Sequence, residues 1–338
     1  MSAELKSRRK GRQPEPSSSP KKAAKQEEPS KTASVPYRYG PLPRFNGQRL
    51  FSRGVIIVGV VIYVWYFSKD GKETSLAKQG SVYNGRGVHV DCDEEYLEEI
   101  KRYSGCVPKR CGRYVSDVIV TDYEATTLLW LAKRGMSFGG SSGGATIMDL
   151  HSGALSYKKN FINMYKSVKT NFITPTDLRV YKDVRQKIQS AIADSFGLDV
   201  NKLFLTHPTF FSRLTSEAPS HDHDEYWHVH VDKHTYESFH YTSLVYLNDF
   251  RVNFKGGRFV YLDNMKNPRA NVTVEPRKGR VSIFTSGAEN PHFVERVTEG
   301  ERFAITISFT CDSSKQIRDP SLSIKGGKSE ERRRFADN

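Results

Sequence analysis

Several features that mark common classes of protein are missing from this sequence. The run Gly139–Gly144 lacks the Gly-Lys-Ser/Thr ending of a phosphate-binding loop, so we interpret it as a flexible loop. Cysteine is scarce: only Cys92, Cys106, Cys111 and Cys311 are present, with no second pair of ligands nearby, which argues against a zinc site. Acidic residues are also scarce, 38 against 52 Lys and Arg, and the formal net charge is +14.

The excess of positive charge lies mainly near the N-terminus. Residues 1–53 hold thirteen Lys or Arg against four Asp or Glu. A segment this polar buries too little apolar surface to offset the entropy of ordering, so we expect residues 1–49 to be disordered. Nucleic-acid binding is an alternative, but no aromatic-basic motif accompanies the lysines, and we expect no nucleic-acid partner. Residues 312–338 are also charged and are expected to form a disordered tail.

One apolar run interrupts this polar start, Gly54–Phe67. It is short for a spanning helix, which needs about 20 residues, but Leu50 and Phe51 extend it and aromatic residues close its downstream end. We therefore predict a single transmembrane signal anchor over residues 50–68; a buried strand pair is the alternative. The basic segment before it favours a cytosolic N-terminus and a luminal body, a single-pass type II arrangement. The short span suits the endoplasmic reticulum, although the C-terminal Ala-Asp-Asn is no retention signal.

Two further features fit a luminal body. The triplet Asn271-Val272-Thr273 is a glycosylation sequon, which makes Asn271 a candidate glycosylation site. All four cysteines follow the apolar run, and an oxidising lumen would allow them to form disulfides. Four cysteines allow three full pairings, and the sequence does not choose among them. A small loop closed between Cys106 and Cys111 is one possibility.

The rest of the chain divides into a polar stretch and a folded domain. Residues 69–115 are polar and are expected to form a luminal stem. Residues 116–311 are expected to form the domain, with helices at Tyr123–Arg134 and Val180–Phe196. From Leu203 onward short strand patterns alternate with turns, which predicts a jelly roll. The expected fold class is therefore mainly β with flanking helices, α+β.

The candidate chemistry centres on the run Trp227–Asp232, which alternates apolar and polar residues. In a strand, His230 and Asp232 point the same way. With His292 they can form a two-His-one-carboxylate metal site, the type associated with non-haem Fe(II) oxygenases. Polar residues on a solvated strand face are the alternative. His228 shares that face and is expected to line the cavity. The histidines and aspartates of 221–224 are interpreted as a hydrated loop.

Five stretches accompany this motif in a fixed order: Tyr241–Asn248, Gly256–Tyr261, Val274–Arg280, Phe284–His292 and Gly300–Phe309. Together they resemble the catalytic domain of the Fe(II)/2-oxoglutarate-dependent prolyl hydroxylases. The stretch Ser286–His292 is most similar to the prolyl 3-hydroxylase branch. The resemblance covers about residues 205–311.

The resemblance implies a double-stranded β-helix that uses Fe(II), 2-oxoglutarate and O2, with ascorbate as reductant. It implies that His230, Asp232 and His292 bind iron. It assigns Arg302 to the distal carboxylate of 2-oxoglutarate, a group that a guanidinium binds in a bidentate manner. Tyr246 matches a tyrosine that shares this carboxylate, and it alternates with Leu244 and Thr242, so all three are expected to line the cavity.

Two positions depart from the pattern of these hydroxylases. Arg258 stands where many relatives have Glu, and Ala304 where many have Ser or Thr. Neither is one of the expected iron ligands. The predicted function is a membrane-anchored luminal dioxygenase that hydroxylates a prolyl or other side chain of a protein or peptide. The alternative is a catalytically inactive jelly-roll module that binds a luminal partner. The substrate and the oligomeric state stay open.

Overall fold

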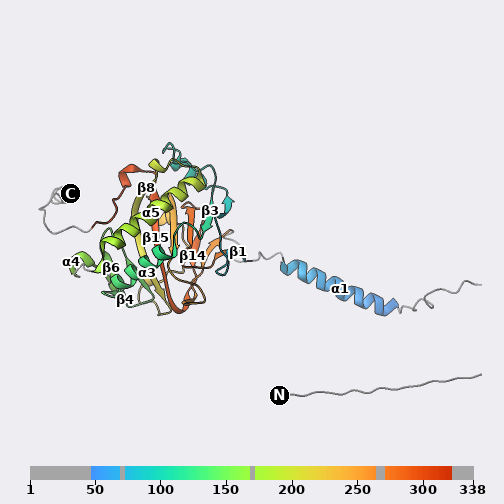
Figure 1. Ribbon diagram of the computed structural model, residues 1–338. Helices are drawn as coiled ribbons and strands as arrows, with labels where there is room; N and C mark the ends of the chain where they lie inside the picture. Colours follow the sequence, from blue (N-terminus) through green and yellow to red (C-terminus); the bar gives the residue numbers. More distant parts are fainter. Residues whose placement is uncertain (1–46, 69–72, 168–171, 264–270, 322–338) are drawn as a thin grey trace, which may run out of the picture. The chain divides into compact units, whose positions relative to one another are not determined.

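The computed structural model describes residues 47–68, 73–167, 172–263 and 271–321 (Figure 1). Helix α1 (Gly47–Ser68) is unbroken, and its stretch Gly47–Tyr66 is long and apolar enough to cross a membrane by length and composition. The predicted span began three residues later, at residue 50. The expected disorder of residues 1–46 and 322–338 lies outside the described residues.

Two sheets form the folded domain in the described part of the chain. The larger runs in the order β2 (Arg86–Val90), β3 (Cys111–Ser116), β13 (Val281–Thr285), β9 (Tyr241–Tyr246), β15 (Val297–Thr310), β8 (Phe204–Thr215), β5 (Ala145–Met148), β6 (Ala154–Lys158), β4 (Gly140–Ser141). Strand β10 (Phe254–Gly256) joins β15, and β7 (Asn160–Asn163) joins β6. The smaller sheet runs in the order β1 (Thr74–Ala77), β12 (Asn271–Val274), β11 (Phe259–Leu262), β14 (His292–Val294).

The two sheets pack face to face through an apolar cluster. Leu244, Tyr246 and Phe284 come from the larger sheet, and Phe259 and Val274 from the smaller one. This is the expected jelly roll, mainly β with flanking helices. It follows from the period-2 pattern of the strands, which turns every second side chain toward the opposite sheet.

Helices cover the other face of the larger sheet. Helix α3 (Asp122–Met136) and helix α5 (Pro175–Phe196) lie across its strands (Figure 1). They contribute Leu128, Val184 and Ile188 to a core that contains the alternate residues Phe303, Ile305, Ile307 and Phe309 of β15. Both helices begin with a capping box, at Thr121 and Thr174. Both were predicted from their apolar stripes, and both begin before the predicted start because their capped first turns are polar. Two short helices, α4 (Met164–Ser167) and α6 (Asp232–Thr235), and the 3-10 turns η2 (Val200–Lys202), η3 (Asp222–Asp224) and η4 (Ser313–Lys315) complete the described elements.

The expected stem at 69–115 is wrong for the part from residue 74 onward. Strand β1 pairs with β12, β2 pairs with β3, and β3 pairs with β13. Helix α2 (Glu94–Ile100) buries Tyr96 and Ile100. Strands β1 and β2 lie at sheet edges and are short and partly polar, and α2 is short and acidic, so their composition does not separate this region from a linker.

The tail boundary also shifts. Asp319 forms an ion pair with Arg185 of α5 at 2.6 Å, and the backbone amide of Ile317 donates to the carbonyl of Leu205. The chain is therefore attached to the domain beyond residue 312, where the tail was expected to begin.

The cysteines form two disulfides, Cys92–Cys111 and Cys106–Cys311. The possible disulfide between Cys106 and Cys111 is therefore wrong. Its two cysteines lie on either side of an irregular turn, and each pairs with a partner that the fold brings close. The second disulfide joins the segment after α2 to the end of β15, across 205 residues of sequence.

Candidate metal and cosubstrate site

The residues expected to bind a metal lie together. Ligand atoms of His230, Asp232 and His292 all lie within 4.8 Å of one another. The Oδ1 atom of Asp232 is 3.6 Å from Nε2 of His230 and 3.5 Å from Nε2 of His292. Asp232 and His292 are buried, and His230 is partly exposed. Among the described residues this is the one such cluster with the right donors and spacing for a metal ion.

The route to this arrangement differs from the expected strand. His230 alone pairs with His292, by two backbone hydrogen bonds of 2.9 and 3.0 Å. The chain then turns, and Asp232 begins the short helix α6. The strand predicted over 227–232 is therefore wrong, because only one residue finds a pairing partner. The turn into α6 nevertheless brings the carboxylate toward both histidines.

Backbone carbonyls hold both imidazole rings. Nδ1 of His230 lies 3.0 Å from the carbonyl oxygen of His228, and Nδ1 of His292 lies 2.9 Å from that of Asn290. A carbonyl only accepts, so each Nδ1 carries the hydrogen and each Nε2 of the neutral ring keeps a free lone pair directed at the cluster. Phe259 stacks on His292 with ring centroids 4.8 Å apart and further fixes that ring.

The carboxylate of Asp232 is held in the ionised state. Burial by itself raises the pKa of Asp232, but His292 and His230 lower it more, and the net result is well below the ordinary value. The hydroxyl of Thr242 donates to Oδ2 of Asp232 at 2.7 Å and lies 2.9 Å from the hydroxyl of Ser286. Oδ1 therefore faces the histidines while Oδ2 is fixed from behind. Ser286 in this role was not predicted.

A cavity of about 300 Å³ opens from this cluster. Its walls are mostly apolar and include Ala145, Ile147, Phe210, Leu214, Phe239, Leu244, Phe259, Phe284 and Val294. Thr242, Arg302 and Thr306 also line it. Arg302 and Thr306 thus lie on the cavity side of β15, opposite its core residues, and Thr242 and Leu244 line the cavity as expected.

Arg302 is a buried cation with spare hydrogen-bond donors. Its residue surface is 1% exposed, and its Nε donates to the carbonyl of Gly257 at 2.9 Å. Its Nη2 is buried and has no hydrogen-bond partner in the part of the chain that the structure describes. Burial lowers the pKa of Arg302. Tyr246 and Tyr226 raise this pKa, but they offset the effect of burial only in part. A buried guanidinium left in this condition is costly, and a carboxylate ligand would satisfy it.

Tyr246 does not line this cavity. Its hydroxyl lies 3.4 Å from the hydroxyl of Ser282, and the guanidinium carbon of Arg302 is 5.4 Å from the centre of its ring. The expectation that its hydroxyl reaches a ligand carboxylate gains no support from these contacts. Tyr226 does line the cavity, and its hydroxyl accepts from the amide of Val297 at 2.9 Å. Nothing in the sequence singles out Tyr226 except its place just before the Trp227–Asp232 run.

Two other arginines of the motif stretches, Arg258 and Arg280, could in principle bind a carboxylate, but both already form ion pairs with acidic residues. Arg258 forms ion pairs with Glu295 at 2.6 Å and with Glu73 at 2.7 Å. The arginine that stands where many relatives have Glu therefore links two segments that are far apart in the sequence. Arg280 binds Asp117 at 2.8 Å. Neither lines the cavity, which leaves Arg302 as the cavity's basic residue.

Two further predictions concern His228 and the loop 221–224. His228 is exposed and lies 2.5 Å from Glu225, so its expected place in the cavity is wrong: the chain turns at residues 226–228 instead of continuing as a strand. In the 221–224 loop, Asp224 is buried and accepts from the hydroxyls of Ser141 and Ser220. That carboxylate anchors the loop to the glycine-rich segment Gly139–Gly144.

Asn271, the candidate glycosylation site, begins β12 and is half-buried; its modification stays a prediction.

Comparison with known proteins agrees with this site. The family model of the 2OG-Fe(II) oxygenase superfamily matches residues 217–310. The chain is 47% identical over 275 residues to the mouse protein named 2-oxoglutarate and iron-dependent oxygenase domain-containing protein 3, covering 80% of this chain and 86% of that one. It is 27% identical to mouse prolyl 3-hydroxylase 1, over 61% of this chain and 29% of that one.

Among solved structures, a Trichoplax adhaerens prolyl hydroxylase matches with a TM-score of 0.40 and 14% identity, over 65% of this chain and 90% of that one. At this TM-score nothing further follows from the likeness. The identity to the mouse protein extends over most of both chains. The chain therefore belongs to the 2OG-Fe(II) oxygenase superfamily, and within it to the family of the 2-oxoglutarate and iron-dependent oxygenase domain-containing protein 3 sequences.

Proposed function

We propose that this protein is a membrane-anchored Fe(II)/2-oxoglutarate-dependent dioxygenase that hydroxylates a prolyl or other side chain of a protein. Nε2 of His230, Nε2 of His292 and Oδ1 of Asp232 hold the iron, and Arg302 holds the distal carboxylate of 2-oxoglutarate. The observation that carries the proposal is that one small cavity contains both a three-residue ligand cluster and a buried guanidinium that has no carboxylate partner among the described residues.

The bound iron and cosubstrate supply the oxygen chemistry: 2-oxoglutarate, O2 and a C–H bond become succinate, CO2 and an alcohol. The residues of this chain prepare the site for it. Thr242 keeps Asp232 oriented, the carbonyls of His228 and Asn290 keep both Nε2 atoms free, and the apolar walls exclude water. Exclusion of water strengthens the attraction between Arg302 and a carboxylate. Ascorbate is the reductant we expect to maintain Fe(II).

The nature of the cavity supports an uncharged target side chain. Apart from the ligand cluster and Arg302, the residues that line it are apolar, aromatic or hydroxyl-bearing, and Asp232 is the one carboxylate in the lining. A lysine or arginine would have to lose its hydration there without a free partner. The relative named prolyl 3-hydroxylase 1 makes proline the first residue to test.

Three features support an anchored, luminal protein. Helix α1 has the length and composition of a membrane span. The four cysteines are paired in two disulfides, which persist in an oxidising compartment such as the endoplasmic reticulum lumen. Asn271 belongs to a sequon. In sealed microsomes, protease should digest the N-terminal segment and spare the residues after 70 until detergent is added. Digestion of both without detergent would contradict a luminal domain.

The activity is tested with full-length protein in detergent micelles, supplied with Fe(II), 2-oxoglutarate and ascorbate. We expect succinate to form, and to form faster with a suitable peptide. Asp232→Ala should abolish this turnover, and the variant should still give the cooperative melting curve of a folded domain. Near-normal succinate formation by Asp232→Ala would remove the His-Asp-His cluster from the proposal. Failure of the wild type to bind 2-oxoglutarate would instead favour a catalytically inactive binding module.

A further inference from the structure

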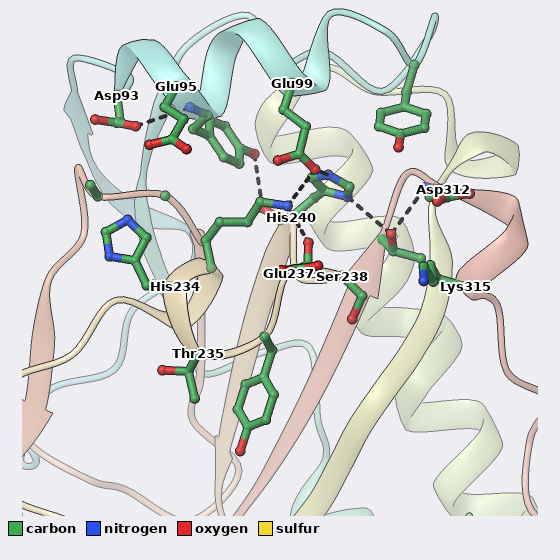
Figure 2. Close-up of a pocket in the computed structure, with 17 residues that line it drawn as sticks. Asp93, Glu95, Glu99, His234, Thr235, Glu237, Ser238, His240, Asp312 and Lys315 are labelled. Carbon is green, nitrogen blue, oxygen red and sulfur yellow. Dashed lines mark hydrogen bonds and ion pairs between the residues drawn. The ribbon is translucent and has the colours of Figure 1, made fainter.

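A larger polar groove lies beside the catalytic cavity. It encloses about 990 Å³ between helix α2 and the segment 233–240, and η4 closes one end (Figure 2). Thr235 and Tyr236 line both this groove and the catalytic cavity. We name it the α2 groove. The groove and the catalytic cavity are therefore neighbours that share part of one wall.

Part of the charge in the α2 groove is neutralised internally. Glu99 accepts from Lys233 at 2.6 Å and lies 3.0 Å from Nε2 of His240 (Figure 2). Lys233 also donates to the carbonyl of Glu237. These groups form the floor of the groove and have no spare charge to offer.

The remaining charge is negative. The groove is lined by the carboxylates of Asp93, Glu95, Glu237 and Asp312, against Lys315 as the one further lysine. Figure 2 shows Glu95 on α2 and Glu237 on the segment below it, facing the same space. Among the described residues, neither carboxylate forms an ion pair within the groove.

Helix capping explains two of these carboxylates, Asp93 and Asp312. Asp93 accepts from the amide of Tyr96 and so caps α2, and Glu95 favours the positive end of that helix. Asp312 caps η4 by accepting from the amide of Ser314 at 2.8 Å, whereas Glu237 belongs to the segment 233–240 and no cap accounts for its place beside α2. Three separate segments thus direct carboxylates into one hollow that adjoins the catalytic cavity.

We propose that the α2 groove binds the part of the substrate next to the hydroxylated residue, and that this part carries lysine or arginine. The inference rests on the proposed function, because it takes the cavity as the place where the target side chain is held. Charge complementarity supports it: a basic segment supplies the cations that the groove lacks. The rings of Tyr103 and Tyr236 offer aromatic faces for the long stems and charged ends of these side chains.

The test uses full-length protein and dye-labelled peptides in fluorescence anisotropy. The probes are Lys-Lys-Gly-Pro-Gly-Lys-Lys and its neutral counterpart with glycine in place of each lysine. We expect the lysine peptide to bind at least about tenfold more tightly at low ionic strength, and the difference to shrink as salt is added. The single variant Glu95→Lys should reduce the difference, and the double variant Glu95→Lys with Glu237→Lys should abolish it.

Glu98→Lys is the matched control. Glu98 lies on the same helix, is exposed, pairs with Lys101 and is not in the groove wall. It makes the same change of charge as Glu95→Lys, and the basic N-terminal segment is identical in all variants, so its contribution cancels. Equal binding of the two peptides to the wild type would overturn the inference, as would a loss in Glu98→Lys as large as that in Glu95→Lys.

The experiment separates failure of the inference from failure of the proposed function. Peptide affinity is measured directly and needs no turnover. Binding of 2-oxoglutarate and succinate formation without peptide are recorded on the same samples. If the protein forms succinate but binds the two peptides equally, only the proposed role of the α2 groove is contradicted. A protein that prefers the lysine peptide but never binds 2-oxoglutarate contradicts the proposed function and leaves an acidic peptide-binding site.

Discussion

Thr242 donates its hydroxyl hydrogen to Oδ2 of Asp232 at 2.7 Å. The donor lies on β9 and the acceptor on α6, so the hydrogen bond fixes the carboxylate of a short helix to a central strand of the larger sheet. Oδ1 is thereby left facing His230 and His292. The orientation of the proposed ligand depends on a residue that binds no metal itself.

The first prediction follows from this contact. Thr242→Val keeps the shape of the side chain but removes the donor, and it should weaken Fe(II) binding about 10–100-fold, the usual effect of losing a partner behind a metal ligand. Anaerobic Fe(II) titration measures the affinity. Thr242→Ser keeps the hydroxyl and should stay close to the wild type. Equal affinities for the valine and serine variants would show that the hydrogen bond does not orient Asp232.

The second prediction concerns Arg302. Its partner in the proposed complex is a desolvated carboxylate, and loss of one member of a buried ion pair costs about 3–5 kcal/mol. At about 1.4 kcal/mol per tenfold, Arg302→Ala should raise the apparent constant for 2-oxoglutarate by about two orders of magnitude or more. Arg302→Lys should rescue part of this loss, because it keeps the charge but not the planar fork. Fe(II) affinity should survive in both variants, and an unchanged 2-oxoglutarate constant in Arg302→Ala would assign the carboxylate to another group.

The third prediction uses the same residue without cosubstrate. Among the described residues the buried Nη2 of Arg302 has no hydrogen-bond partner, so we expect the guanidinium to destabilise the domain when no ligand is bound. Arg302→Met fills similar space without a charge, and its melting temperature without 2-oxoglutarate should equal or exceed that of the wild type. Adding 2-oxoglutarate with Mn(II) should raise the melting temperature of the wild type and leave that of Arg302→Met unchanged. A variant much less stable than the wild type would show that Arg302 already has a stabilising partner.

The fourth prediction concerns the pH dependence of stability. The hydrogen bond from His240, together with the hydrogen bond and charge of Lys233, outweighs the opposing effect of burial and lowers the pKa of Glu99 from 4.5 to about 2. A lowered carboxyl pKa contributes stability that is complete above pH 4.5 and disappears as the pH falls toward about 2. Urea unfolding of wild type and Glu99→Gln should therefore give a difference that is largest at neutral pH and shrinks below pH 4.5. A difference that does not change with pH would show that the charge of Glu99 is not involved.

The fifth prediction concerns the start of the domain. A chain beginning at residue 116 loses β1, β2, α2 and most of β3, and leaves Cys311 without Cys106. It should be insoluble or fail to give a cooperative melting curve. A chain beginning at residue 73 keeps all of these and should melt as the full-length protein does. A stable, cooperative domain from residue 116 would restore the interpretation of residues 69–115 as a stem.

The sequence by itself determined the parts of this protein that have a strong local pattern. The apolar stripes of α3 and α5 and the alternation in β15 depend on residues close in the chain, so a reader of the sequence can recognise them. The motif set around His230, Asp232, His292 and Arg302 was recognisable for a similar reason. These residues lie at fixed spacings inside stretches that resemble known hydroxylases.

Tertiary structure alone decided the contacts between segments far apart in the chain. Strands β1 and β3 carry too little local signal to be told from a linker, because their pairing partners, β12 and β13, begin about 170 to 200 residues later. The cysteine pairing, the unpartnered Nη2 of Arg302 and the carboxylates of the α2 groove have the same origin. Each depends on which side chains the folded sheets bring within a few ångströms of one another, and hydrogen bonding and charge pairing act only at such distances.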